Sequence, residues 1–499
     1  MKTGILCGVA VVALVGCAGA HPVPIAPESP AANRAAQTAP LLLVDPSKPG
    51  AVVSSAVLGA NMATWYDVTQ SGLSAAFKTA GLRSTRWPGG SESDNFHWET
   101  DSLGPGACGG GYVNANSTFE HFWSDIVHPA RLDVAVTVNY GSNPACTGGA
   151  DPGEAAGWVK YLNASKRYGL TWWSVGNEQY GSWETDLHSQ PHDPSQYASL
   201  VASSFYPKMH AASPTPIDVC VDVDPDTRGW DATVLARAKY DCVELHYYPQ
   251  GNTVDDPFLI EKAAPGLAAY LGRLKTELAT AGRPKTPIYV GEIGSTYGTP
   301  GKQTMSITQA LYAGQVVGEL LKAGAARATW WIGYGGCNSE SAGGDFSPSL
   351  YGWQDFGGYM IFSDGTLADG CSATDVPRGT LLPTARALQV ASHFVRDGER
   401  MLQLRKTGLA RVRAYATTYD GGYALMLFNL SQSKAADVPV KIAGKASGAG
   451  GEIAIYDRAL YDASKQNDWK GPIFRNLRSW SGQFSVTLPP WSIVTVRTK

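Results

Sequence analysis

The chain has 499 residues, a length that suits one large domain plus a smaller one, and its hydrophobic fraction of 44% is ample for a core. This composition excludes a disordered protein. The 40 basic and 43 acidic residues give a net charge of −3 without a long basic run, which excludes the electrostatic footprint of a nucleic-acid-binding protein.

The first twenty residues have the pattern of a bacterial export signal. Lys2 supplies a positive start, and the apolar stretch over residues 4–16 is too short to span a membrane. Residues 14–17 resemble a lipobox, which implies a lipid anchor on Cys17. The alternative is ordinary cleavage after residues 18–20. Residues 21–40, rich in Ala and Pro, are predicted to form a linker. We therefore expect an exported protein, either anchored to the cell envelope or periplasmic or secreted.

Export places the cysteines of the mature chain in an oxidising compartment. After Cys7 and Cys17 are set aside, an even number remains, which favours disulfides over free thiols. These cysteines lack the close spacing of a structural zinc site, and we predict no metal and no cofactor. Proximity along the chain predicts the pairs Cys108–Cys146, Cys220–Cys242 and Cys337–Cys371.

The next part of the chain alternates strand-like and helix-like segments. Short runs rich in β-branched and aromatic residues occur at 56–63, 82–87, 132–140, 171–175, 217–223, 240–247, 287–290 and 328–332. Helical stretches between them include 151–168, 195–211, 264–281 and 304–323. Alternating strands and helices form a parallel sheet, and eight units close into a barrel. We predict an α/β fold, a (β/α)8 TIM barrel, over residues 56–384.

The pattern changes in residues 385–499. Short strand-like runs follow one another at 411–415, 422–430, 436–441, 452–456 and 484–488, several of them separated by Gly or Asn turns. This arrangement predicts an antiparallel β-sandwich. The strand-like start of residues 41–55, ahead of the barrel, is predicted to join that sandwich.

Two predicted barrel strands end in a carboxylate. One ends in Gly176-Asn177-Glu178 and another in Gly291-Glu292. The chemistry of an α/β barrel lies at the carboxyl ends of its strands. Glycoside hydrolysis needs two carboxyl groups, one to protonate the departing oxygen and one to attack the anomeric carbon or activate water. Glu178 and Glu292 are therefore the candidate catalytic pair, and salt-bridged residues at the barrel rim are the alternative.

These motifs resemble glycoside hydrolase clan A, whose members are barrels that retain anomeric configuration. Residues 86–90 (Arg-Trp-Pro-Gly-Gly), 139–141 (Asn-Tyr-Gly) and 154–163 are similar to the α-L-arabinofuranosidase family, glycoside hydrolase family 51. Residues 246–251 and 291–298 are closer to the heparanase and β-glucuronidase family, glycoside hydrolase family 79. The chain departs from family 51 by having Asn61, Ser91 and Ile293-Gly294 where that family usually has Glu, Asn and Trp.

The resemblance implies a role for each residue. Glu292 would be the nucleophile, with its charge stabilised by Arg86 and Tyr248. Glu178 would be the acid and base, with a pKa raised by apolar surroundings and by the neighbouring carboxylate. The two carboxyl groups should lie about 5 to 5.5 Å apart. The residues expected to bind or orient the substrate are Asn61, Arg86, Asn139, Asn177, His246, Tyr248 and Trp330, with Trp330 favoured over Trp331 for the sugar face.

Three functions remain open on the sequence. The first is a retaining glycosidase acting on plant-type oligo- or polysaccharides, specifically an α-L-arabinofuranosidase. The second is a β-glucuronidase or heparanase-like enzyme, for which His210, Arg228 and Lys302 are not obviously placed to bind a uronate. The third is a non-catalytic carbohydrate-binding lipoprotein. The expected partner is a saccharide, with membrane contact only through Cys17. The sequence does not predict an oligomeric state.

Overall fold

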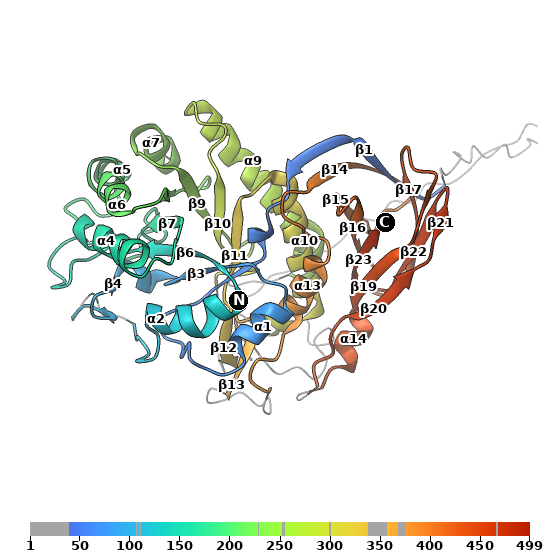
Figure 1. Cartoon of the computed structure of the whole chain (residues 1–499), viewed down its shortest axis with the longest axis horizontal. Helices are drawn as coiled ribbons and strands as arrows, with labels where there is room; N and C mark the ends of the chain where they lie inside the picture. The colour runs from blue at the N-terminus through green and yellow to red at the C-terminus, as the bar shows by residue number, and fades with distance from the viewer. Residues whose placement is uncertain are drawn as a thin grey trace, which may run out of the picture. The chain divides into compact units, whose positions relative to one another are not determined.

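The structure, a computed structural model, describes residues 39–105, 108, 111–227, 229–251, 255–298, 301–337, 357–367, 376–465 and 468–499. They form a closed eight-stranded barrel and a nine-stranded sheet (Figure 1). The predicted fold class, a (β/α)8 barrel with a C-terminal β-sandwich, is confirmed. The predicted export segment and Cys17 lie outside the described residues. Within the described part of the chain, no helix is both long and apolar enough to cross a membrane.

Each predicted barrel strand overlaps an observed one. In spatial order around the barrel they are β10 (Ile288–Ile293), β11 (Arg327–Trp330), β2 (Gly59–Asn61), β3 (Ser84–Trp87), β6 (Asp133–Val138), β7 (Trp172–Val175), β8 (Asp218–Asp222) and β9 (Cys242–Tyr247). All pairings between them are parallel. Their side chains are almost all buried, as expected for a parallel sheet covered by helices. The carboxyl ends of the strands therefore meet at one rim.

Helices cover the barrel between the strands. They are α1 (Leu73–Thr79), α2 (Phe119–His121), α3 (His128–Ala130), α4 (Pro152–Val159), α5 (Pro194–Leu200), α6 (Tyr206–Ala212), α7 (Trp230–Arg237), α8 (Asp256–Phe258), α9 (Ala264–Thr280) and α10 (Ile307–Ala323). Local signals set their ends. The Ser306 side chain accepts a hydrogen bond from the Gln309 amide at the start of α10, and Gly324, with φ +70°, ends that helix in the left-handed region.

The nine-stranded sheet has the order β20-β19-β23-β16-β15-β14-β1-β17-β22. Strand β1, blue in Figure 1, runs antiparallel to β14 and parallel to β17. Side chains from β1, β17 and β22 share one hydrophobic cluster with side chains from β16 and β23, so the sheet folds into two facing layers. The strands are β1 (Leu41–Val52), β14 (Arg400–Thr407), β15 (Val412–Tyr419), β16 (Gly422–Asn429), β17 (Ala436–Ile442), β19 (Gly451–Asp457), β20 (Ile473–Leu477), β22 (Phe484–Leu488) and β23 (Ser492–Thr498).

The barrel and the sandwich share a packed interface. Helix α10 contacts α13 (Pro383–Ser392), and α13 in turn contacts β19 and β23. The Tyr415 hydroxyl donates to Glu319 Oε1 over 2.8 Å across this interface. The predicted domain boundary at residues 384 and 385 falls inside α13, which packs against both parts of the chain.

Two of the three predicted disulfides are present. Cys108 and Cys146 have a Cα–Cα distance of 5.7 Å, and Cys220 and Cys242 have one of 4.4 Å. The second bond joins neighbouring strands β8 and β9, where the two cysteines are register partners. Cys337 also forms a disulfide. Its predicted partner, Cys371, lies outside the described residues.

Candidate active site

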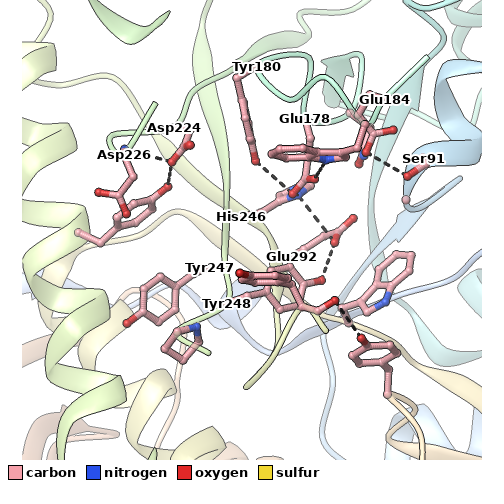
Figure 2. Close-up of a pocket in the computed structure, with 18 of the residues that line it drawn as sticks. Ser91, Glu178, Tyr180, Glu184, Asp224, Asp226, His246, Tyr247, Tyr248 and Glu292 are labelled. Atoms are coloured by element: carbon pink, nitrogen blue, oxygen red, sulfur yellow. Dashed lines mark hydrogen bonds and ion pairs between the residues drawn. The ribbon is translucent and has the colours of Figure 1, made fainter. Parts of the chain in front are cut away.

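The barrel rim brings the two predicted carboxylates together (Figure 2). Glu178 follows strand β7, and Glu292 is part of strand β10. One oxygen atom of each carboxylate and one nitrogen atom of His246, from β9, all lie within 4.8 Å of one another. Glu178 has a φ of +48°, a left-handed conformation that is uncommon outside glycine and often found at functional sites.

Arg86 on strand β3 contacts several other polar side chains at the base of the site. Its Nη1 donates to Glu292 Oε1 over 3.0 Å, its Nη2 donates to Asn177 Oδ1 over 2.7 Å, and its Nε lies 3.0 Å from Glu244 Oε1. Burial lowers the pKa of Arg86, but the Glu244 and Glu292 charges outweigh burial and raise that pKa, so the guanidinium is charged.

Two residues predicted to bind the substrate, Arg86 and Asn61, lie behind the cavity wall instead of on it. Arg86 and Asn61 are both completely buried and do not line the cavity. Asn61 donates to the Gly291 carbonyl over 2.9 Å and accepts from Arg86 over 3.2 Å. Neither residue is placed to contact the substrate directly: Asn61 positions Arg86, and Arg86 positions Asn177 and Glu292, the partner expected for it.

Glu292 accepts a hydrogen bond on each oxygen. Arg86 donates to Oε1, and the Tyr248 hydroxyl donates to Oε2 over 2.6 Å. Burial and the Glu292 charge raise the pKa of Tyr248 well above its usual value, so the phenol keeps its proton and acts as a donor. Both predicted partners of Glu292 are therefore in contact with it.

Glu178 is held by three donors. The His246 Nδ1, the Trp183 Nε1 and the Tyr180 hydroxyl lie 2.7, 2.7 and 3.1 Å from its carboxylate oxygens. Burial raises the pKa of Glu178, but His246, Trp183 and Tyr180 together outweigh burial and lower that pKa below its usual value. The expectation of a raised pKa is wrong, because the site surrounds this carboxylate with donors instead of apolar groups.

His246 carries a positive charge between the carboxylates. Burial lowers its pKa, but the Glu292 charge and the contacts with Glu178 and Glu244 outweigh burial and raise that pKa well above its usual value. Its Nδ1 lies 2.7 Å from Glu178 and 3.7 Å from Glu292. Glu178, His246 and Glu292 have a spacing that a metal ion could bridge. A metal ion bound there would have to displace the proton of His246, because an imidazole ligand binds in its neutral form.

Glu184 is a site residue that the sequence analysis did not identify. Its Oε1 accepts from Asn177 Nδ2 over 2.9 Å and from Ser91 Oγ over 3.0 Å. Burial, reinforced by the Glu178 charge, raises the pKa of Glu184 to about 8. Asp94, also buried, accepts the Asn177 backbone N–H on both oxygens, each at 3.2 Å. Asn177 is thus fixed by a second layer of carboxyl groups.

Two other predictions need correction. Trp331, not Trp330, lines the cavity. Trp330 points outward and makes an edge contact with Tyr312 of α10, with ring centroids 5.8 Å apart. Asn139 does not reach the cavity either, because it exchanges hydrogen bonds of 3.0 and 3.1 Å with the Ser142 backbone and so closes a turn.

The site opens into a cavity of about 1060 Å³. Its walls are rich in aromatic and acidic side chains, whereas His246 and Arg273 are the basic ones among the described lining residues. Arg273 is paired with Asp226 over 2.5 Å. The acidic side chains are Glu92, Glu178, Glu184, Asp224, Asp226 and Glu292. The aromatic ones are Trp65, Tyr180, Trp183, Tyr247, Tyr248, Phe258, Tyr270, Tyr297, Trp331 and Tyr359.

Solved structures share this fold over 92% of the chain. An α-L-arabinofuranosidase from Thermotoga maritima, in complex with arabinose, has a TM-score of 0.69 at 14% identity over 92% of this chain and 99% of its own. A family 51 arabinofuranosidase from Xanthomonas axonopodis pv. citri has a TM-score of 0.67 at 18% identity over 92% and 100%. A Paenibacillus polymyxa xyloglucanase of family 44 has a TM-score of 0.63 at 13% identity over 92% and 99%. No family model and no curated protein matches the sequence.

Proposed function

We propose that this protein is a retaining glycoside hydrolase that removes α-L-arabinofuranosyl groups from plant-type oligo- or polysaccharides. The observation that carries the proposal is the pair of carboxylates at the ends of β7 and β10, with oxygen atoms within 4.8 Å. Retaining glycosidases hold their carboxyl groups about 5 to 5.5 Å apart, whereas inverting ones need about 6.5 to 9.5 Å to admit a water molecule, and the close approach of one oxygen atom from each residue favours the shorter spacing. The arabinofuranosidases among the similar structures support the choice of sugar.

In the first half of the reaction, a Glu292 oxygen attacks the anomeric carbon as the bond from that carbon to the leaving oxygen breaks. The leaving oxygen takes a proton that His246 supplies through Glu178, and a covalent glycosyl-enzyme forms. In the second half, Glu178 removes a proton from water, the water oxygen attacks the anomeric carbon, and Glu292 departs as a carboxylate. Two inversions retain the configuration of the sugar.

The proton for the leaving oxygen resides on the Glu178–His246 pair. In the free protein Glu178 is ionised and His246 is positively charged. The Glu178 Oε1 and His246 Nδ1 atoms lie 2.7 Å apart. Glu292 is the largest contributor that raises the pKa of His246. When Glu292 bonds to the sugar it loses its charge, and His246 then holds its proton less strongly. Attack by the nucleophile therefore promotes proton release toward Glu178 and the leaving oxygen.

The cavity favours a neutral sugar over a uronate. A uronate carboxylate would need basic or amide donors, and the charged side chains of the described lining are mostly acids. His210 instead contacts Asp241 over 2.8 Å, and neither His210 nor Lys302 lines the cavity. Arg228 lies outside the described residues. The glucuronidase-like alternative therefore has less support than the arabinofuranosidase.

The third alternative, a carbohydrate-binding lipoprotein without activity, has no specific observation in its favour. Both carboxylates are present, and each has its own set of donors. Export, with lipid attachment at Cys17, remains part of the proposal.

The two carboxylates can be told apart by azide rescue with 4-nitrophenyl α-L-arabinofuranoside. We expect E292A to lose turnover, because no glycosyl-enzyme can form. We expect E178A to form the intermediate, since nitrophenolate needs little protonation, and to accumulate it because no base activates water. Azide needs no deprotonation, so it should rescue E178A and give a glycosyl azide of retained configuration.

A matched control is E452A, which changes a Glu of the sandwich strand β19 that does not line the cavity. It should keep wild-type turnover. An inverted azide product from E178A would exchange the two roles. Full activity in both E178A and E292A would place the site elsewhere. A wild-type protein that cleaves aryl β-glucuronides instead would establish the second alternative.

A further inference from the structure

The cavity extends well beyond the two carboxylates. Figure 2 shows Glu178, His246 and Glu292 in its middle, Ser91 and Glu184 on one side, and Asp224, Asp226 and Tyr247 on the other. A volume of about 1060 Å³ lies at the upper end of the range of about 300 to 1000 Å³ that holds a drug-sized ligand. One sugar ring at the carboxylates leaves most of this space open.

Exposed aromatic rings gather around this cavity. Trp183, Phe258 and Tyr297 are 67%, 37% and 70% exposed, and all three line it. Large aromatic side chains are normally covered, so several exposed rings around one opening mark a binding surface. Sugar rings present C–H faces that pack on aromatic rings, and hydroxyl edges that bond to carboxylates and guanidinium groups.

On the side of the cavity away from Ser91 and Glu184, five lining residues form a surface that we call the outer shelf: Asp224, Asp226, Phe258, Tyr270 and Arg273. Asp224 and Asp226 follow strand β8, Phe258 ends α8, and Tyr270 and Arg273 lie on α9. The Tyr270 hydroxyl donates to Asp224, Arg273 pairs with Asp226 over 2.5 Å, and the Arg273 guanidinium lies 5.2 Å from the centre of the Tyr270 ring. Its polar groups are thus held in place before any ligand binds.

The outer shelf lies on the side of the acid. Tyr180, which donates to Glu178, links the two regions. Burial and the Glu178 charge raise the pKa of Tyr180, and nearby Tyr270 and Asp224 add to this effect. Because the acid protonates the leaving oxygen, the leaving group lies beside Glu178, from where the cavity wall continues through Tyr180 to the shelf.

We infer that the outer shelf binds the leaving-group part of the substrate, a neutral carbohydrate chain of at least two sugar units. This inference rests on the proposed function, because it takes Glu178 as the acid. The shelf has two carboxylates against one guanidinium, so it disfavours a chain that carries uronic acids. The preferred substrate is therefore an oligo- or polysaccharide, not a small glycoside.

The test compares kcat/KM for 4-nitrophenyl α-L-arabinofuranoside with kcat/KM for linear α-1,5-linked arabino-oligosaccharides of two to five units. In the wild type we expect kcat/KM to rise with chain length until the shelf is filled. F258A should lower the ratio of oligosaccharide to aryl-glycoside kcat/KM by about five- to tenfold, the effect of one lost ring contact. D226A should lower the same ratio by removing a hydroxyl acceptor and freeing Arg273.

Matched controls come from the sandwich. F474A removes a phenylalanine that is 49% exposed and does not line the cavity. D462A breaks the exposed Arg458–Asp462 pair, as D226A breaks Arg273–Asp226. Both controls should keep the wild-type ratio, and thermal melts of all four variants check their folding.

The outcomes separate the two proposals. If the aryl glycoside is hydrolysed but chain length has no effect, or if F258A and D226A behave like their controls, the inference is overturned and the proposed function stands. If the wild type hydrolyses no arabinofuranoside, the proposed function fails and the inference falls with it.

Discussion

Glu184 is a protonated carboxyl group next to the reactive pair. Its Oε1 accepts hydrogen bonds from Asn177 and Ser91, whereas its Oε2 is buried and has no hydrogen-bond partner among the described residues. With a pKa of about 8, raised by burial and by Glu178, it is neutral at neutral pH. Glu184 ionises as the pH rises past that value, which adds a charge near Glu178 and disturbs the Asn177 amide.

E184Q should therefore change the alkaline limb of the pH profile. Gln keeps the neutral, hydrogen-bonding shape, so the variant should stay active below pH 8. Above pH 8, wild-type kcat/KM should fall as Glu184 ionises, whereas the variant should hold its kcat/KM to higher pH. A profile of kcat/KM from pH 5 to 10 for both proteins checks this. Superimposable alkaline limbs would show that ionisation of Glu184 does not matter.

Protein stability gives a second measurement of the same group. The pKa of Glu184 is raised from 4.5 to about 8, so its contribution favours folding at low pH and is lost as the pH rises through this window. E184Q removes the titrating group. The melting temperature of the wild type should therefore decline more steeply than that of E184Q between about pH 5 and 9.

Sequence reasoning reached some site residues and missed others for physical reasons. Glu178 and Glu292 follow apolar strand runs, and a barrel brings the ends of its strands to one rim. Choosing between Trp330 and Trp331 needs the twist and exit angle of β11, which a pattern does not contain. The lowered pKa of Glu178 depends on donors such as Trp183, whose approach is set by the folded loop after β7.

At the scale of elements, the Cys220–Cys242 bond joins strand β9 to strand β8, the strand that leads to Asp224 and Asp226 of the outer shelf. It closes a loop with a sequence separation of 22. Replacing both cysteines by Ala should lower stability by about 3 kcal/mol through loop entropy. For a chain of this length, that corresponds to a melting temperature about 3 °C lower. Scanning calorimetry of the double variant checks this value, and an unchanged melting temperature would contradict the assigned role.

The strands divide into those with a clear sequence signal and those without. Barrel strands such as β6 are buried along nearly all of their length, so their apolar runs stand out. Strand β14, with the sequence Arg-Met-Leu-Gln-Leu-Arg-Lys-Thr, is largely exposed and carries three basic residues, and the sequence analysis did not identify it. Its place between β15 and β1 is set by tertiary pairing, which a local pattern does not encode.

At the scale of the whole molecule, helix α10 of the barrel packs closely against the sandwich at two of its glycines, Gly314 and Gly318. A Cβ atom at Gly318 would lie 2.4 Å from the Tyr415 ring, and one at Gly314 would lie 2.4 Å from Ile493. The Tyr415 ring is held by its hydrogen bond to Glu319, so it has little freedom to move aside. These glycines let the sandwich pack directly on the helix backbone.

G318A should therefore destabilise the protein by about 1 to 3 kcal/mol through overpacking, or about 1 to 3 °C in melting temperature. The matched control is G272A, at an exposed position of α9 where a Cβ would meet nothing within 4 Å. G272A should be stabilising by up to about 1 kcal/mol, because Ala favours a helix more than Gly does. Equal melting temperatures for the two variants would refute close packing at this interface.

Strand β1 has a consequence for the order of events during synthesis. It is made before the barrel, yet Leu41 meets its partner Thr407 across a sequence separation of 366 residues. At about 5 to 20 residues per second, a ribosome needs about 20 to 70 s to make that partner. During this wait Leu42 and Val44 have no sheet to join and could pair with another nascent chain. Pro46, Lys48 and Pro49 interrupt the second half of β1, and such residues oppose edge-to-edge association.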